Sequence, residues 1–288
     1  MTSGDARTIR ICHLYPRLLS VAGDRGNLFA IMQRCAWRGI RYHVTEADVG
    51  AVPDFAQCDL ILLHGGQDRE MSVAARDLAA KSGPLRDAIE GGAVVIAVCA
   101  GYQLLGHHYA PVDGPPIPGL GVLDAVTEGG PTRFIGHVAV ECELGFGPKR
   151  MLTGFENHSG RTYLGRGAAP LGRVLAGAGN NGEDGTEGAR YREVYATYLH
   201  GPVLPKNPWL ADHLLSRALA HRYTDAGPLA PLTDHAEDHA HAAALRLARR
   251  PAGRLRAATA ALSRFGRPAQ EPATAGGLTG METAWISR

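Results

Sequence analysis

The sequence places a cysteine where a buried strand would end and a helix would begin. The apolar run "AVVIAV" (93–98) leads into Cys99, and the small residues Ala100 and Gly101 follow. A sharp strand-to-helix turn of this kind presents a side chain above the sheet and sets a thiol at a helix N-terminus, which favours the thiolate. Free cysteine is also among the most buried residue types, so Cys99 alone fits a core residue equally well.

Two glycines at the end of another apolar run offer a second part of an active site. "CDLILLHGGQD" (58–68) ends in Gly65 and Gly66, where the backbone can come close to a ligand. The N–H groups of Gly66 and Ala100 would then form an oxyanion hole, in which each donor is worth about 3–4 kcal/mol. An ordinary Gly-Gly turn is the alternative interpretation of the pair.

A histidine partner for the cysteine is visible in "TYLHGP" (197–202), where His200 ends a strand-like run. Cysteine and histidine meet in space rather than in sequence, so their separation is no objection. His137, His158 and the pair His107–His108 are equally visible, and spacing alone cannot choose among them.

The elements that must position these residues alternate between strand and helix patterns. We expect strands at 8–15, 40–47, 58–66 and 93–98, and helices at 28–38, 69–81 and 84–90. Alternation predicts an α/β fold with a mostly parallel sheet and helices on both faces. Loops at the carboxyl ends of such strands carry the site, and both Gly66 and Cys99 fall there.

The second half of the chain has a different texture. Short strand patterns at 133–142, 161–165, 172–179 and 192–200 predict an antiparallel extension joined to the same sheet, and a closing helix is expected at 207–223. From residue 224 the composition shifts to Ala, Arg, His, Pro and Gly. We expect one domain at 8–223 and a C-terminal appendage at 224–288, partly helical or disordered.

Composition excludes several classes of protein. The 288 residues are 45% hydrophobic with a formal net charge of +2, and they contain neither a basic block nor an apolar run of membrane-spanning length. We therefore expect no nucleic-acid partner, no transmembrane segment and, without a signal-peptide pattern, a cytoplasmic protein. Five cysteines without a C-x-x-C pair indicate reduced thiols and no zinc site. His235 and His239 have helical metal-ligand spacing, but their acidic surroundings favour a solvated face, so no metal is expected.

Taken together, the motifs resemble those of a known family. "VIAVCAGYQLLG", "HGGQDRE", "ENHSGRTYLG" and "TYLHGPVLPKNPWLADHLL" resemble the class I glutamine amidotransferases, in particular the cobyric-acid-synthase-like branch. Within that branch the chain is similar to the glutaminase subunits of bacterial lipid II isoglutaminyl synthases. The likeness covers about residues 8–223 in order.

The resemblance implies a flavodoxin-like α/β fold and a role for each matching residue. Cys99 would be the nucleophile and His200 the general base, and Arg133 would hold L-glutamine. An arginine suits the α-carboxylate because its planar fork pairs bidentately with it. Gln103 lies one helical turn after Cys99, where it would either touch the bound amide or face the surface.

One position departs from the family pattern. Many class I amidotransferases carry a glutamate two residues after the histidine, and this chain has Pro202 there. The dyad would then lack its orienting acid, which the resemblance implies that a partner supplies. We therefore expect this chain alone to be a poor glutaminase.

The chain shows no ATP-binding motif, and "GDRGN" (23–27) is interpreted as a turn before a helix. No cofactor is expected on this chain, and the resemblance places ATP and Mg on a MurT-like synthetase subunit of the Mur-ligase family. Ammonia passed to that partner would amidate the D-glutamate α-carboxylate of lipid II to D-isoglutamine, at the inner face of the membrane.

Three alternatives remain open. The acceptor could be a corrin carboxylate, as in cobyric acid synthesis, although those enzymes usually carry an ATP-dependent domain ahead of the glutaminase. The fold could instead serve a non-catalytic binding protein with an idle cysteine. A stand-alone cysteine hydrolase is the third alternative, and it would turn over without any synthetase.

Overall fold

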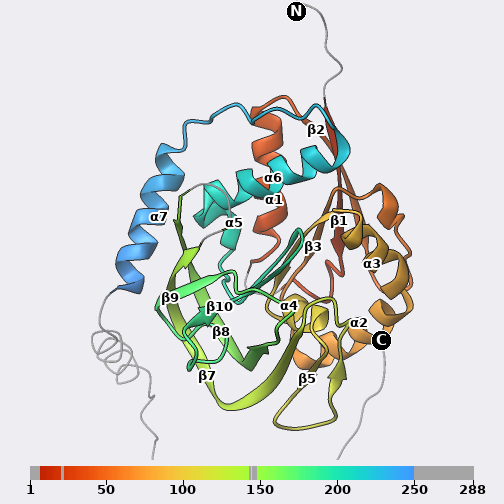
Figure 1. Cartoon of the computed structure of the whole chain (residues 1–288), viewed down its shortest axis with the longest axis vertical. Coiled ribbons are helices and arrows are strands. Elements are labelled where there is room, and N and C mark those ends of the chain that lie inside the picture. The colour runs from red at the N-terminus through yellow and green to blue at the C-terminus, as the bar shows by residue number, and fades with distance from the viewer. Residues whose placement is uncertain (1–6, 21–22, 143, 145–147, 250–288) are drawn as a thin grey trace, which may run out of the picture. The chain divides into compact units, whose positions relative to one another are not determined.

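A mostly parallel sheet forms the centre of the computed structural model, which describes residues 7–20, 23–142, 144 and 148–249 (Figure 1). Its strand order is β11-β12-β4-β3-β1-β2, and every neighbouring pair is parallel except β11 with β12. The strands are β1 (Thr8–Leu14), β2 (Arg41–Ala47), β3 (Leu60–Leu63), β4 (Val94–Val98), β11 (Ala189–Tyr191) and β12 (Val194–Thr197). The parallel strands thus follow a flavodoxin-like order, which confirms the expected α/β class.

Helices cover both faces of this sheet. They are α1 (Gly26–Trp37), α2 (Asp68–Ala80), α3 (Ser82–Glu90), α4 (Ala100–Leu105), α5 (Val203–Lys206) and α6 (Pro208–Arg222), with a short 3-10 turn at Phe55–Gln57. The crossover from β1 to β2 and the crossover from β3 to β4 run in opposite directions along the sheet. Because both are right-handed, α1 lies on one face and α2 with α3 on the other. Helix α6 packs beside α1 and against β1, β3 and β4.

The core is centred on the two middle strands. Every residue of β3 and β4 is buried, as expected of parallel strands that are covered on both faces. The edge strand β2 is mostly exposed by comparison. A rigid, close-packed centre of this kind fixes the carboxyl ends of β3 and β4, where Gly66 and Cys99 follow.

The remaining strands form a second sheet, of order β10-β9-β7-β5-β6 with β8 paired to β7, and its neighbours are antiparallel except β5 with β7. They are β5 (His108–Ala110), β6 (Ile117–Pro118), β7 (Ala125–Cys142), β8 (Arg150–Leu164), β9 (Gly172–Ala176) and β10 (Thr186–Glu187). The expectation that they extend the first sheet is therefore wrong. Strand β11 already covers the edge of β12, and only an isolated bridge between Phe155 and His200 joins β8 to that region.

Residues 224–249 pack on the same compact unit, which extends to Arg249. The buried guanidinium of Arg34 on α1 donates to Asp212 Oδ2 at 2.7 Å and to Asp234 Oδ2 at 2.8 Å. Helix α7 (His235–Ala248) then contacts α5, β7 and β8. Part of the predicted appendage is thus helical, and an ion pair with Arg34 attaches the segment that precedes the helix. The rest of the appendage lies outside the described residues.

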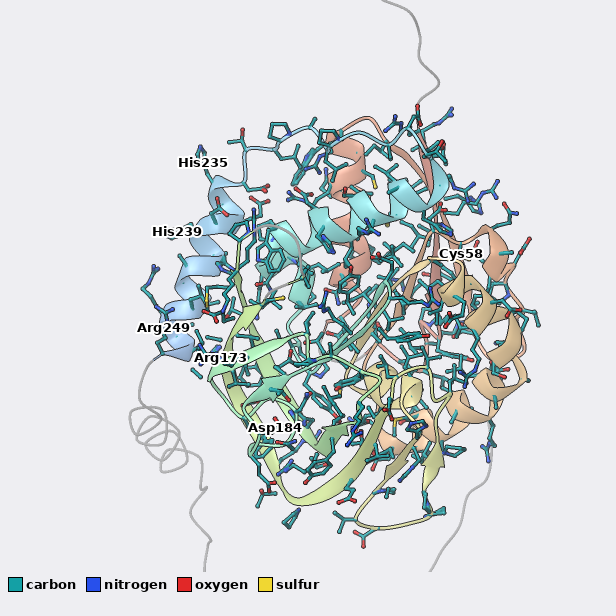
Figure 2. The ribbon with its side chains drawn as sticks, viewed as in Figure 1. Cys58, Arg173, Asp184, His235, His239 and Arg249 are labelled. Atoms are coloured by element: carbon teal, nitrogen blue, oxygen red, sulfur yellow. The ribbon has the colours of Figure 1, made fainter. Side chains whose placement is uncertain are left out.

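Two searches of the described residues bear on membranes and metals. No helix among residues 7–249, less the gaps given above, is long and apolar enough to cross a membrane. The same residues contain no group of three or more His, Cys, Asp or Glu side chains arranged to hold a metal ion. His235 and His239 are exposed on the outer helix α7 (Figure 2).

Candidate active site

Cys99 occupies a sharp turn between β4 and α4. Its backbone has φ 52° and ψ −105°, a conformation that side-chain-bearing residues rarely adopt. The N–H of Cys99 donates to the carbonyl of Thr197 at 2.9 Å, and the N–H of Gln103 donates back to the carbonyl of Cys99 at 3.0 Å. The surrounding structure thus holds the strained turn in place, and the Cys99 residue is 9% exposed. This geometry favours the nucleophile interpretation over the core one.

Gly101 is required by the close approach of α4 to β3. A side chain at this position would overlap the carbonyl oxygen of Leu63 and part of its side chain, and neither can retreat within the core. We expect Gly101→Ala to lower the free energy of unfolding by about 1–3 kcal/mol and to displace Cys99, with loss of activity. Gly83→Ala is the matched control, because Gly83 lies in helix α3 with no atom within 4 Å of the added methyl. Equal thermal stability and activity of the two variants would contradict this account.

His200 reaches the cysteine because its strand pairs beside the elbow. Strand β12 runs parallel to β4 in a register that aligns Thr197 with Val98. Beyond the strand, His200 exchanges two backbone hydrogen bonds with Phe155 of β8, at 2.9 and 3.1 Å. Its side chain is 3% exposed and lies within interaction range of the Cys99 thiol. The structure therefore brings together the two residues that the sequence proposed as a dyad.

The third member of the site is Asp24, from the loop between β1 and α1. Its Oδ2 lies 3.0 Å from Nδ1 of His200, and the carboxylate is fully buried. The inference from Pro202 that this chain lacks an orienting acid is therefore wrong, whereas "GDRGN" is a turn before a helix, as predicted. The expectation of a poor glutaminase loses its structural basis, because the acid lies within the chain.

Pro202 itself helps to bring that acid into place. Its ring packs against Gly26, where an added side chain would overlap the ring carbons. Gly26 begins α1 and follows Asp24 by two residues, so the loop and the histidine strand lie against each other. In this chain proline occupies the position of the usual glutamate, and Asp24 reaches His200 from the loop after β1 instead.

The protonation of His200 follows from these contacts. Burial disfavours the imidazolium, but hydrogen bonds to Asp24 and Cys99 outweigh it and raise the pKa of His200 to about 10. At neutral pH the ring is then charged, with Asp24 on one side and the thiol on the other. An imidazolium beside the thiol can protonate a leaving nitrogen.

Other histidines near the site do not compete for this role. His158 is buried and stacks on Tyr198 with ring centroids 3.7 Å apart, and burial lowers its pKa to about 4. His107 pairs with Asp124 at 3.1 Å, and His137 lies edge-on to Phe155. His200 is thus the histidine with both a thiol and an acid as partners.

The two predicted oxyanion donors follow neighbouring strands of the first sheet. Gly66 follows β3 and Ala100 begins α4, so both border the elbow. Among the described residues, no hydrogen bond uses the backbone N–H of Gly66 or of Ala100. Two such groups beside a thiol can bind the oxygen of a tetrahedral intermediate, and their assignment to this role stays a prediction.

Comparisons with known proteins identify the family of the chain. Residues 10–208 match the family model of the CobB/CobQ-like glutamine amidotransferase domain. The chain is 41% identical to the lipid II isoglutaminyl synthase (glutamine-hydrolyzing) subunit GatD of Staphylococcus aureus, over 73% of this chain and 84% of that protein. It is 39% identical to the subunit of the same name from Streptococcus pneumoniae, over 75% of this chain and 82% of that protein. The chain belongs to the CobB/CobQ-like glutamine amidotransferase family.

A solved structure supports the fold alone. PurLQS from Thermotoga maritima superposes with a TM-score of 0.53 at 15% identity, over 75% of this chain and 99% of that chain. Because it belongs to this family, the chain is a glutamine amidotransferase.

Arg133 is exposed on β7 and hydrogen-bonds the facing strand β8. Its Nε donates to Asn157 Oδ1 at 2.8 Å, and one terminal nitrogen donates to the carbonyl of Asn157 at 3.2 Å. Asn157 and Arg133 belong to the facing strands β8 and β7. The guanidinium is therefore oriented by the hairpin, and its role toward the substrate stays a prediction.

Gln103 is committed to a buried network beside the thiol. Its Nε2 donates to Tyr198 Oη at 3.1 Å, and Tyr198 in turn shares a hydrogen bond with Thr162 at 2.6 Å. Of the two alternatives for Gln103, the exposed one is wrong, because the residue is 7% exposed. The network fixes the strand that carries His200 from the side of the second sheet.

Glu187 anchors that strand as a buried acid which sequence patterns did not single out. It accepts hydrogen bonds from Tyr198 N at 2.7 Å and from Thr197 Oγ1 at 3.0 Å. Burial, opposed by these bonds, raises its pKa to about 7. The folded state therefore holds this proton more tightly than the unfolded state does, whose pKa is about 4.3.

A pH dependence of stability follows from Glu187. The stabilisation linked to its proton is present below the unfolded pKa and is lost as the pH rises through about 7, a change of about 3 kcal/mol. We expect Glu187→Gln to remove this decline in the free energy of unfolding, measured by urea titration between pH 4.5 and 7.5. The exposed Glu128→Gln serves as control, and equal pH slopes in both variants would count against the assignment.

Two buried histidines behind the site were also missed. His13 Nε2 and His64 Nδ1 lie 3.1 Å apart, at the ends of β1 and β3. Burial lowers the pKa of His13 to about 4 and that of His64 well below its usual range, so both are neutral. Their positions directly at strand ends were the only signal in the sequence.

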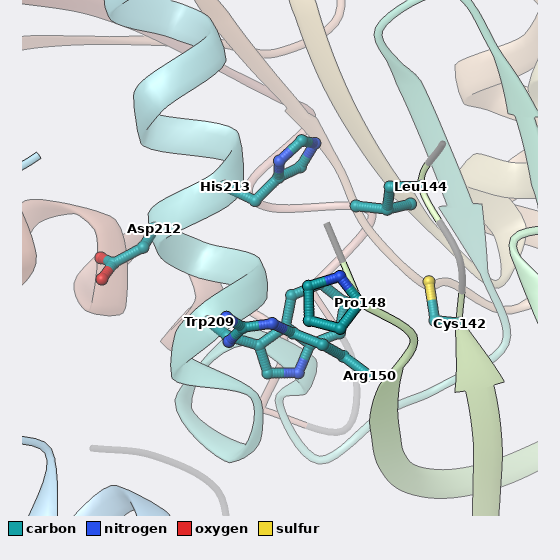
Figure 3. Close-up of a pocket in the computed structure, with 7 residues that line it drawn as sticks. All are labelled: Cys142, Leu144, Pro148, Arg150, Trp209, Asp212 and His213. Atoms are coloured by element: carbon teal, nitrogen blue, oxygen red, sulfur yellow. The ribbon is translucent and has the colours of Figure 1, made fainter. Parts of the chain in front are cut away.

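A cavity of about 300 Å³ lies elsewhere, between α6 and the far end of the β7–β8 hairpin (Figure 3). Trp209, Asp212 and His213 line it from α6, and Cys142 and Arg150 line it from the hairpin. Its lining residues include neither Cys99, His200 nor Asp24. The candidate site at the strand ends of the first sheet is therefore separate from this cavity.

Proposed function

We propose that this chain is the glutaminase subunit of a two-subunit amide ligase that amidates lipid II. The observation that carries the proposal is the contact of His200 with Cys99 on one side and Asp24 on the other. The relatives named GatD support the acceptor, since their names state lipid II as the substrate of the synthase.

The reaction follows from the side chains in place. The Cys99 thiolate attacks the side-chain amide carbon of L-glutamine, and the oxygen takes up negative charge facing the N–H groups of Gly66 and Ala100. The C–N bond breaks as His200 donates its proton to the nitrogen, which leaves as ammonia. Water then loses a proton to His200 and attacks the γ-glutamyl thioester. Glutamate leaves and the thiolate is restored.

Asp24 keeps the imidazole in the orientation that this sequence needs. With Nδ1 held by the carboxylate, the other ring nitrogen faces the thiol and then the leaving nitrogen. The charge of Asp24 also stabilises the imidazolium that exists before the first step. Arg133 would pair with the substrate α-carboxylate.

The second half of the proposal concerns the partner. A MurT-like synthetase with its own ATP and Mg would activate the D-glutamate α-carboxylate of lipid II and receive the ammonia. This chain would need no cofactor, and the complex would act in the cytoplasm at the inner membrane face.

The test is co-purification with a MurT-like protein, followed by amidation of lipid II with glutamine or with ammonium chloride as nitrogen donor. We expect D-isoglutamine from both donors in the complex, and glutamine-driven product only when this chain is present. Glutamine hydrolysis without any lipid II amidation would overturn the acceptor and leave the glutaminase. Absence of glutamine hydrolysis in the complex would overturn the proposal as a whole.

A further inference from the structure

A carboxylate lies near Arg133, and none of the steps above uses it. Asp68 is the first residue of α2, two residues after Gly66. The hydroxyl of Tyr109 donates to Asp68 Oδ2 at 3.4 Å and also hydrogen-bonds Ser159. The same phenol lies within electrostatic reach of Arg133. One buried tyrosine therefore links a carboxylate and a guanidinium.

Further contacts connect Ser159, the neighbour of Tyr109, with Gln103 and Cys99. Ser159 is flanked by His158, which stacks on Tyr198, and by Gly160, which lies directly against the amide nitrogen of Gln103. The backbone N–H of Gln103 in turn donates to the carbonyl of Cys99, one helical turn earlier. The contacts thus run without a break from the nucleophile to Ser159.

Asp68 also has no competing cation. Among residues 7–249, less the undescribed gaps, no lysine, arginine or histidine forms an ion pair with it, and its side chain is exposed. Tyr109 does not neutralise it, because burial raises the pKa of the phenol and keeps it a neutral donor. The negative charge of Asp68 is therefore available to a ligand.

L-Glutamine itself carries a cation that can pair with Asp68. A free amino acid carries an α-ammonium beside its α-carboxylate, and a site that pairs only the carboxylate leaves the ammonium without a partner. Two residues of extended chain span at most about 7 Å, so the step from Gly66 to Asp68 is comparable to the length of a glutamine side chain. One glutamine molecule can therefore place its amide oxygen at Gly66 and its α-ammonium group at Asp68.

We propose that Asp68 binds the α-ammonium group of L-glutamine and makes the enzyme selective for amides of free α-amino acids. The inference rests on the proposed glutaminase function and on Arg133 as the carboxylate site. Asp68 also stands in the first turn of α2, where a negative charge stabilises the helix. Glu70 lies in the same first turn of α2. A substitution of Glu70 therefore separates helix stabilisation from substrate binding.

The test compares L-glutamine with 4-carbamoylbutanoate, which is glutamine without its α-amino group. Ammonia release by the full chain, alone and with its synthetase partner, gives kcat/KM for each compound. Asp68→Asn should lower kcat/KM for glutamine by about 10- to 100-fold, the worth of one charge-assisted hydrogen bond. The same variant should change kcat/KM for the des-amino compound by less than about threefold. Asp68→Glu keeps the charge and should retain most of the preference for glutamine.

Glu70→Gln is the matched control and should leave the ratio of the two kcat/KM values unchanged, whatever it does to thermal stability. An equal loss on both compounds in Asp68→Asn would overturn the inference, and so would no loss on either. Both results would leave the glutaminase proposal standing, because wild type would still hydrolyse glutamine. If wild type in the complex hydrolysed neither compound, the glutaminase proposal would fail and this inference with it.

Discussion

Replacing Cys99 by alanine is expected to abolish glutamine hydrolysis and to leave synthesis from ammonia intact. The side chain forms the covalent intermediate, so its removal should reduce glutamine turnover by at least about 10⁴-fold. Alanine fits the site, because the Cys99 residue is small and only 9% exposed. With the synthetase partner, amidation of lipid II driven by ammonium chloride should proceed at the wild-type rate.

Cys58→Ala is the control for this result. Cys58 is buried at 6% exposure at the end of the 3-10 turn that contacts α3, and the neighbouring thiol of Cys12 lowers its pKa (Figure 2). A lowered pKa makes Cys58 a competing thiol. Glutamine-driven product should persist in Cys58→Ala. Glutamine-driven product in Cys99→Ala would refute the role assigned to Cys99.

Replacing Asp24 by asparagine should have the second-largest effect. Asparagine keeps the shape of the side chain but removes the charge that holds the imidazolium, so kcat for glutamine hydrolysis should fall by about 10³- to 10⁴-fold. Because the hydrogen bond to Asp24 raises the pKa of His200 to about 10, its loss should lower that pKa. The alkaline limb of the kcat/KM profile should then move to lower pH.

The exposed Asp113→Asn provides the matched control, with unchanged kcat and pH profile. Circular dichroism and thermal melting of Asp24→Asn confirm that the fold survives. A variant with wild-type kcat and an unmoved alkaline limb would mean that the partner, rather than Asp24, orients His200.

Much of the first sheet could be predicted because its strands are short, apolar and separated by helical periodicity. Strands β1, β2 and β4 and helices α1, α2 and α6 lie within a few residues of their predicted bounds. Hydrophobic periodicity reports burial directly, so these elements carry their own signal. The pairing of the antiparallel strands carries no such signal. Which sheet β7 and β8 join depends on partners far away in the sequence.

The residues of the site likewise divide into those that local sequence features predict and those that depend on distant contacts. Cys99 and Gly66 were predictable because strand-end position and small neighbours are local features. His200 needed the family resemblance, because several histidines have similar local settings. Asp24 was missed because its function depends on the contact of its loop with the strand end at His200, 176 residues away. The glycine-flanked acid at a strand end was the one available signal, and turn chemistry explained it equally well.

The central claim is that Cys99, activated by His200 and Asp24, is the nucleophile that attacks glutamine. The most direct measurement is covalent labelling by a glutamine-analogue electrophile, followed by peptide mass mapping of all five cysteines. The account predicts one label per chain on Cys99, protection by L-glutamine, and slower labelling in Asp24→Asn. Burial raises the pKa of Cys35 and Cys142 to about 12, so neither should react. A label on Cys58 with Cys99 unmodified, or turnover that persists after Cys99 is fully labelled, would contradict it.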